Sequence, residues 1–188
     1  MHLYEGTFII LDLDLSLFYW ISQHFQSPMM DKFMLFVTIK ENFYIPGLLC
    51  LVTLLGTYKN RGLVFIIAAG IVIGLTDAIG HNILKEGIQR VRPCHVLSQD
   101  IIGIVSCSNS FSFPSNHAAN TFCAATILSL CFRNTTLMAF AFALIVCYSR
   151  VYLRVHYPSD ILGGMVLGTA MGFLGYLVYG KLLKHIKL

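Results

Sequence analysis

The sequence predicts an all-α fold, a polytopic bundle of about five transmembrane helices with interfacial helices at its N-terminus. Two observations predict it. Hydrophobic residues make up 56% of the 188 positions and charged residues only 12%, whereas soluble domains usually carry about 25% charged residues. The apolar residues also gather in long runs separated by short polar stretches, as expected of membrane-spanning helices. We therefore expect residues 1–188 to form a single integral-membrane domain.

Five of these runs are long enough to cross a hydrocarbon core about 30 Å thick, which takes roughly 20 helical residues. The five runs are residues 42–58, 62–84, 115–132, 135–152 and 160–180. Together they define a transmembrane core, residues 42–180. The first run is short and contains Pro46, so it either extends back into the preceding segment or tilts in the bilayer. Residues 1–40 alternate apolar runs with polar breaks, a pattern typical of one or two amphipathic helices at the interface.

The charges in the connections between the expected spans predict an orientation. On one side of the membrane all of them are basic: Lys59, Arg61, Arg133, Lys181, Lys184 and Lys187. By the positive-inside rule this side, which includes the C-terminus, is cytoplasmic. No run of consecutive basic residues could follow a nucleic-acid backbone, so we exclude nucleic acid as a partner.

Three groups of mainly polar residues fall at the ends of the spans on the non-cytoplasmic side. Their members are Lys85, Arg92 and Pro93, then Pro114, Ser115 and His117, and finally Ser149, Arg150, His156 and Asp160. Cations on this side break the positive-inside rule, which indicates that they serve an anionic ligand. Three cations, a hydroxyl, two histidines and a carboxylate are the groups that metal-free phosphoryl transfer requires.

Two of the groups also have a simpler structural interpretation when each is taken alone. Ser115 precedes an apolar run and could serve only as the N-cap of its helix. Lys85 and Arg92 could form a basic collar that snorkels at the end of a span. The third group is harder to explain structurally, because Asp160 can reach back to His156 and hold one imidazole nitrogen while the other attacks. Cations on both sides of Ser115 favour phosphate binding at the start of its helix.

In order and spacing these residues resemble the three signature motifs of the type-2 phosphatidic acid phosphatase superfamily, membrane lipid phosphatases related in site to vanadium haloperoxidases. The family motifs read Lys, six residues, Arg-Pro; then Pro-Ser-Gly-His; then Ser-Arg, five residues, His, three residues, Asp. They match residues 85–93, 114–117 and 149–160. One position departs from the pattern, because Asn116 stands where the family usually has Gly, although its backbone N–H donor remains.

The resemblance implies a role for each motif residue. His156 would attack phosphorus and form a phosphohistidine with Asp160 holding its ring, and His117 would protonate the leaving oxygen and then activate water. The phosphate oxygens would be held by Lys85, Arg92, Ser115, Asn116 and Arg150. No metal ion or other cofactor is required. We expect three further substrate contacts outside these positions: Arg90, Arg154 and His95.

The implied activity is hydrolysis of a lipid phosphomonoester or pyrophosphate on the periplasmic face of a bacterial inner membrane. We favour a lipid A 1-phosphatase, because the additional cations suit a large, multiply anionic headgroup. Undecaprenyl pyrophosphate and phosphatidylglycerophosphate phosphatases remain alternatives, as does a transporter or scaffold that binds lipid phosphate without turnover. A transporter is disfavoured because the polar residues gather at one surface and not at the bilayer midplane. No obligate protein partner is expected.

Cysteine, glycine and one buried acid add further expectations. Cys94 and Cys107 share the loop after the second run on the non-cytoplasmic side, where we expect a disulfide beside Arg92. Asp77 lies within that run, and we expect its side chain to bond to a neighbouring helix and not to couple to an ion. Glycines at helical spacing predict close helix contacts, at Gly70, Gly74, Gly164, Gly168 and Gly172.

Overall fold

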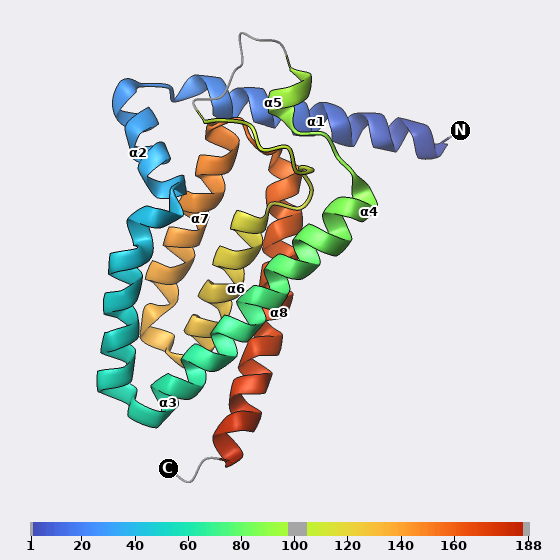
Figure 1. Ribbon diagram of the computed structural model, residues 1–188. Helices are drawn as coiled ribbons and strands as arrows, with labels where there is room; N and C mark the ends of the chain where they lie inside the picture. The colour runs from blue at the N-terminus through green and yellow to red at the C-terminus, as the bar shows by residue number, and fades with distance from the viewer. Residues whose placement is uncertain (1, 98–104, 186–188) are drawn as a thin grey trace.

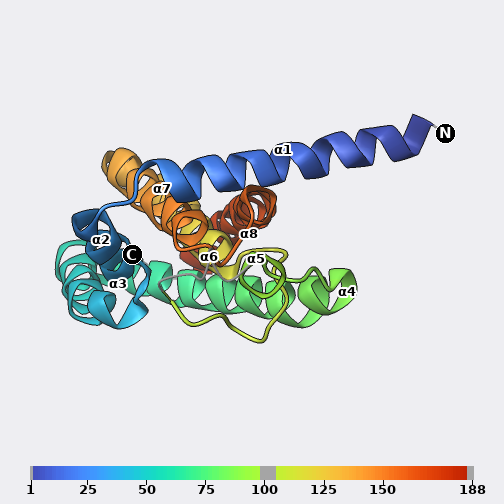
Figure 2. The same ribbon diagram turned by 90° about the horizontal axis from the view of Figure 1, so that it is seen from above.

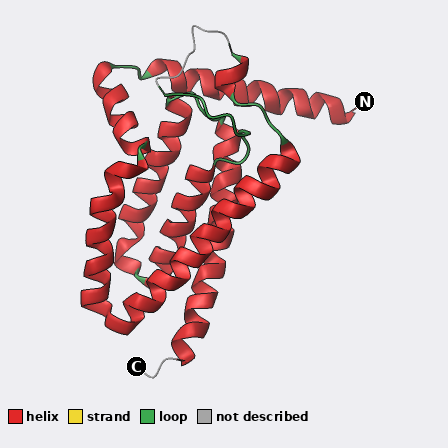
Figure 3. Cartoon of the chain, in the orientation of Figure 1, coloured by secondary structure: helices red, strands yellow, loops and turns green. Residues whose placement is uncertain are grey.

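The computed structural model of the protein describes residues 2–97 and 105–185, and all regular structure within them is helical, as predicted (Figure 3). Three segments are long and apolar enough to cross a membrane: Lys40–Val96, Arg133–Tyr152 and Pro158–Lys184. The expected number of about five is not confirmed. Two features of the chain explain the difference, a reversal inside one long helix and the shortness of another.

The reversal lies in α3 (Tyr44–Ala78), which follows a short 3-10 turn, η1 (Lys40–Phe43). At Lys59 the backbone leaves the helical region, with φ 48° and ψ −121°, and the chain turns back on itself (Figure 1). The two arms touch beside the reversal, since a Cβ on Gly62 would lie 2.5 Å from the Leu54 carbonyl oxygen, and they diverge away from it (Figure 1). The runs expected at 42–58 and 62–84 are thus the two arms of one helical hairpin. Pro46 falls in the first turn of α3, where a missing N–H removes no helical bond.

The short helix is α6 (Asn116–Cys131), whose 16 residues rise only about 24 Å. It is packed between α3, α7 (Thr136–Tyr152) and α8 (Pro158–His185), and a 3-10 turn, η4 (Arg133–Thr135), joins it to α7. Its position in the centre of the bundle (Figure 1) lets it tolerate Thr126 and Ser129, both more than 90% buried. Its ends match the expected run 115–132 within one residue.

Glycines bring α6 and α8 together. A Cβ on Gly164 would lie 2.5 Å from the Ser115 carbonyl oxygen, and one on Gly172 would lie 2.7 Å from that of Cys123. Gly168 meets α6 equally closely through Ala119. The predicted contacts are therefore confirmed on α8. On α3 the prediction is wrong, because a Cβ on Gly70 or Gly74 would find no atom within 4 Å.

Two helices precede the bundle core, α1 (His2–His24) and α2 (Pro28–Thr38). Ser27 caps α2 by accepting a hydrogen bond from the Met30 N–H, and Pro28 occupies its first position, where proline is favoured. Figures 1 and 2 show that α1 lies across one end of the bundle, roughly at right angles to the long helices. α2 instead runs beside α7, in line with the long helices (Figure 1). The interfacial position of residues 1–40 therefore stays a prediction, and of the two helices only α1 has the orientation that it requires.

At that same end of the bundle α3 continues into a π-helical turn, η2 (Ile79–Lys85), and the short α4 (Glu86–Ile88), followed by α5 (Pro93–Val96). The α3 reversal, η4 and the C-terminal end of α8 lie at the opposite end (Figure 1). This separation matches the predicted division of the cations between two sides, although Lys187 lies outside the described residues. The orientation in a membrane stays a prediction.

Candidate active site

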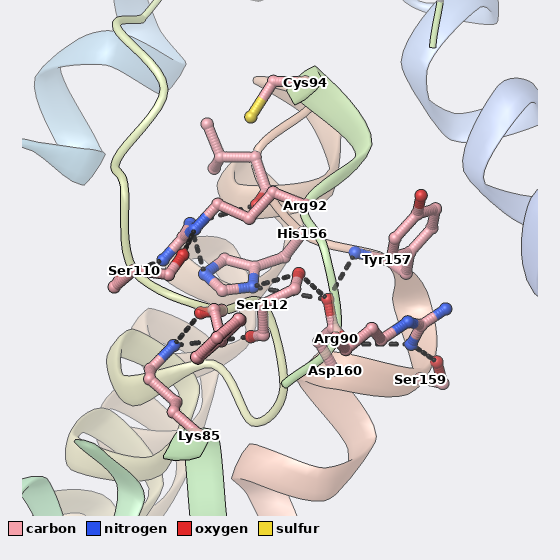
Figure 4. Close-up of polar contacts among 12 residues, drawn as sticks. Lys85, Arg90, Arg92, Cys94, Ser110, Ser112, His156, Tyr157, Ser159 and Asp160 are labelled. Atoms are coloured by element: carbon pink, nitrogen blue, oxygen red, sulfur yellow. Dashed lines mark hydrogen bonds and ion pairs between the residues drawn. The ribbon is translucent and has the colours of Figure 1, made fainter. Parts of the chain in front are cut away.

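Members of the three predicted groups converge at the α1 end of the bundle in a buried polar site. Figure 4 shows Lys85 and Arg92 of the first group beside His156 and Asp160 of the third. Side chains from η2, α6, α7 and α8 and from the loops before α5 and α8 meet there, and none is more than 8% exposed: Lys85, Arg92, Ser115, Arg150, His156 and Asp160. Buried cations are normally paired with anions. In the described part of the chain, Lys85, Arg92 and Arg150 form no ion pair with a carboxylate. The site therefore has an excess of buried positive charge.

His156 occupies the loop between α7 and α8, with each ring nitrogen facing a different group. Nδ1 lies 3.4 Å from Asp160 Oδ2, and Nε2 lies 3.2 Å from Arg92 Nη1. Because a guanidinium can only donate, Nε2 must present its lone pair to Arg92, and Nδ1 then carries the proton that faces the carboxylate. Burial, with Arg92 and Arg150 adding to it against the opposing effect of Asp160, lowers the pKa of His156 to about 3. The ring is a neutral imidazole with its lone pair at Nε2, as a nucleophile requires.

The guanidinium of Arg92 is fixed by the backbone around it. Its Nε donates to the Ser110 carbonyl at 2.7 Å, its Nη2 to the Ser110 hydroxyl at 3.0 Å, and its Nη1 to the Val155 carbonyl at 3.1 Å. A disulfide between Cys94 and Cys107 ties the two sides of this loop together, with their Cα atoms 6.1 Å apart. The pairing expected from the sequence is present, and it anchors the chain two residues after Arg92.

The remaining phosphate-site candidates leave hydrogen-bonding groups without protein partners. Lys85 Nζ donates to the Phe111 carbonyl at 2.6 Å, and one nitrogen of Arg150 donates to the Thr38 hydroxyl of α2. Arg150 Nε and the Ser115 hydroxyl, however, are buried and have no partner among the described residues. Ser115 is the N-cap residue of α6, as predicted, but its side chain makes no capping bond. Unpaired buried polar groups are rare, so this hydroxyl favours ligand binding over plain capping.

The start of α6 also carries Asn116 and His117. The Asn116 amide donates to Asp77 Oδ1 at 2.9 Å, and the Asn120 amide donates to the same oxygen at 2.8 Å. Asp77 thus bonds a neighbouring helix, as predicted. Asn116 fits where the family usually has Gly because it faces Gly80, where an added Cβ would lie 2.8 Å from Asn116 Oδ1. His117 is half-buried in the first turn of α6.

The three residues expected as additional substrate contacts all bond to protein groups. Arg90 pairs with Asp14 and Asp160 at 2.6 and 2.7 Å. Arg154 donates to the Ser22 carbonyl at 3.1 Å, and His95 Nε2 lies 3.1 Å from the Ser108 carbonyl oxygen. Their contact with substrate stays a prediction, and the structure gives each of them a role in holding the loops and α1.

Sequence reasoning did not identify Ser112 or Asp14. The Ser112 hydroxyl donates to Asp160 Oδ2 at 2.5 Å and lies 3.4 Å from His156 Nδ1, so it braces the His156–Asp160 pair. It stands three positions before Ser115, but a lone serine in a loop carries no signal of such a role. Asp14 lies in the N-terminal segment, far in sequence from every motif, and its contacts depend on how α1 packs.

Comparison with known proteins extends these observations. The model of the PAP2 superfamily matches residues 59–184. The lipid A 4′-phosphatase of Bacteroides thetaiotaomicron is 30% identical over 185 residues, covering 94% of this chain and 80% of that protein. Phosphatidylglycerophosphatase B of Bacillus subtilis is 36% identical over 110 residues, or 53% of this chain and 51% of that protein. The crystal structure of Aquifex aeolicus LpxE has a TM-score of 0.68 and 26% identity, and covers 87% of this chain and 94% of that one.

Proposed function

This chain belongs to the PAP2 superfamily and is a membrane-lipid phosphate hydrolase, and we propose that it works without metal through a phosphohistidine at His156. One observation carries this proposal. A neutral, buried imidazole presents its lone pair at a place where Lys85, Arg92 and Arg150 have no carboxylate partner. A phosphate group would supply both the missing negative charge and the electrophile.

In the first step the lone pair of His156 Nε2 attacks phosphorus. Arg92 Nη1, now 3.2 Å from that nitrogen, turns to a phosphate oxygen as the new P–N bond forms. Burial beside Arg150 and Arg92 lowers the pKa of His117 before substrate binds, so this histidine takes up a proton together with the anionic phosphate group. The P–O bond to the lipid breaks, its electron pair stays on the leaving oxygen, and His117 donates that proton to it. Asp160 faces Nδ1–H and stabilises the positive charge that develops on the ring.

In the second step a water molecule attacks the phosphohistidine. His117, now deprotonated, accepts the proton of the water, the P–N bond breaks and its electron pair returns to Nε2. In both steps the cations and the Ser115 hydroxyl hold the nonbridging oxygens while charge builds on them. Inorganic phosphate leaves and the histidines regain their starting protonation states.

We infer that the substrate is lipid A and that the 4′-phosphate is the group removed. A relative with that activity aligns with 94% of this chain, so the alignment extends well beyond the motifs. The sequence argument for the 1-phosphate rested on four additional cations, Arg90, Arg154, Lys32 and Lys40. Two of these, Arg90 and Arg154, bond to protein groups. Phosphatidylglycerophosphate is the second candidate because a relative named for acting on it is 36% identical to this chain over 110 residues. A periplasmic site at a bacterial inner membrane accords with either lipid.

Phosphate release by the purified protein in detergent and EDTA tests these proposals. The panel is lipid A, undecaprenyl pyrophosphate and phosphatidylglycerophosphate, with mass spectrometry to identify which phosphate of lipid A is lost. His156→Ala should abolish release and the acid-labile phosphoenzyme, while His24→Ala, an exposed histidine on α1, should leave both unchanged. Turnover by His156→Ala, or inhibition by EDTA, would contradict the proposed mechanism. Loss of the 1-phosphate would overturn the positional assignment alone.

A further inference from the structure

A chain of charged groups connects α1 to the nucleophile. Asp14 of α1, only 6% exposed, pairs with Arg90 at 2.6 Å. Arg90 in turn pairs with Asp160 Oδ1 at 2.7 Å, and the other oxygen of Asp160 faces His156. Figure 4 shows Arg90 beside Asp160 and Ser159, on the side of Asp160 away from Arg92.

We propose that Asp14 and Arg90 are positioning residues that hold Asp160 against His156, so that α1 completes the catalytic site. This inference rests on the proposed function, because it assigns how the nucleophile is held. It concerns a segment outside residues 59–184, which the family model matches, and a residue, Arg90, that stands between the fixed positions of the first motif.

The oxygens of Asp160 show why Arg90 is needed. Oδ2 accepts bonds from the Tyr157 N–H at 2.9 Å and the Ser112 hydroxyl at 2.5 Å, in addition to facing His156. Oδ1 accepts only from Arg90 in the described part of the chain, and Asp160 is fully buried. Without Arg90, a buried carboxylate oxygen would lose its partner and the group would turn to find another. The turn would carry Oδ2 away from the imidazole.

Arg90 is itself held in one orientation from two directions. Its guanidinium carbon lies 4.0 Å from the centre of the Tyr157 ring, a cation–π arrangement. Its two terminal nitrogens bond to different carboxylates, Nη1 to Asp160 and Nη2 to Asp14. A lysine has a single point charge and cannot span both carboxylates as this planar fork does.

Asp14 has a second role at the start of α8. Its Oδ1 accepts the Ser159 N–H at 2.8 Å, and its Oδ2 accepts the Ser159 hydroxyl at 2.5 Å. The first N–H groups of a helix have no partner within the helix, and Ser159 is the second residue of α8. Asp14 therefore caps, from another helix, the turn that contains Asp160. A negative charge is also favoured at this end of a helix dipole.

α1 buries one side against the bundle and exposes an apolar side. Asp14 and Phe18 face the bundle, and the buried Phe18 ring lies 5.6 Å from that of Tyr157. The exposed side carries Leu13, Leu17 and Trp20, which are 47–57% exposed and spaced at four and three residues, as on one helix face. An apolar face on a helix that crosses the end of a membrane bundle suits the interface. The helix that braces the His156–Asp160 pair thus presents an apolar face on its other side.

Steady-state and rapid-quench kinetics of Asp14→Asn, Arg90→Lys and the double variant test the proposal. Asp12→Asn is the matched control, because Asp12 is an exposed carboxylate on the same helix. We expect kcat and the rate of phosphoenzyme formation to fall roughly tenfold to a hundredfold in each single variant. KM and the affinity for inorganic phosphate should change less than twofold, because the groups that hold phosphate are untouched. The double variant should lose little more than either single one, since the two residues act in one chain.

The outcomes separate this inference from the function on which it rests. If the wild-type protein releases no phosphate from any lipid, the proposed function fails. If it does, and His156→Ala does not, the function stands. Asp14→Asn behaving like Asp12→Asn would then overturn the positioning role. Equal losses of kcat, inorganic-phosphate affinity and thermal stability would also overturn it, because they would show that α1 only supports the fold.

Discussion

Replacing Gly164 by alanine should separate the two helices that carry the phosphate site. The added Cβ would lie 2.5 Å from the Ser115 carbonyl oxygen and 2.8 Å from Ala118 Cβ, whereas an ordinary contact is at least 3.4 Å. The shortfall is about 0.9 Å, and a backbone carbonyl at a helix start cannot move aside alone, so α8 and α6 must part by a similar amount. Overpacking of this kind costs about 1–3 kcal/mol. The start of α6 moves with it, which can lower the rate of catalysis by up to about a hundredfold.

The assay is phosphate release together with thermal unfolding in detergent, for Gly164→Ala and Gly70→Ala side by side. Gly70 is the matched control because an added Cβ there meets nothing within 4 Å, and alanine is the better helix former by about 1 kcal/mol. We expect an apparent Tm several degrees lower for Gly164→Ala and no loss for Gly70→Ala. Equal stability and activity in the two variants would refute the argument that α8 glycines set the spacing of the site.

Three other perturbations follow from the site. Burial lowers the pKa of His156 to about 3. Between pH 6.5 and 3 the unfolded chain therefore binds a proton at this residue that the folded chain does not, and stability should fall as the pH falls. The Tm of His156→Gln should drop less between pH 7.5 and 5 than that of the wild type, and an equal drop would contradict the assignment. Removing the Cys94–Cys107 disulfide, whose cysteines are 13 residues apart, should lower the free energy of unfolding by about 3 kcal/mol and reduce activity. Cys50→Ser, at an exposed free cysteine, should change neither stability nor activity. Asp77→Asn should keep measurable phosphate release, because Asp77 bonds Asn116 and Asn120 and no group of the nucleophile; complete inactivity would show that it belongs to the site.

The helices could be predicted from the sequence because their causes are local. Run length, hydropathy and terminal residues place α7 and α8 close to the expected 135–152 and 160–180, and the observed helices are Thr136–Tyr152 and Pro158–His185. The count of membrane-crossing segments was harder, since it depends on a backbone reversal at Lys59. The polar residues Lys59, Asn60 and Arg61 mark that position in the sequence, but the reversal is so tight that the two runs form the arms of one continuous helical segment.

The convergence of the motif residues was also predictable, because their spacing on the expected spans places them at one surface. Their supporting partners were not. Asp14 contacts Ser159 across 145 positions, and Ser112 contacts Asp160 across 48, so nothing near either residue in the sequence indicates the bond. The glycines show the same limit, because those of α3 and α8 share a spacing and only those of α8 meet another helix.

The sequence by itself determined that this protein is a helical membrane hydrolase and which ten residues form its motifs, because hydropathy, helix ends and phosphate chemistry are properties of individual residues and short spacings. Only the tertiary structure decided how those residues are held. Packing of α1 across the bundle placed Asp14 and Arg90 behind Asp160, and burial left His156 neutral beside unpaired cations. Burial and long-range ion pairs depend on every surrounding helix at once, and no single stretch of the chain encodes them.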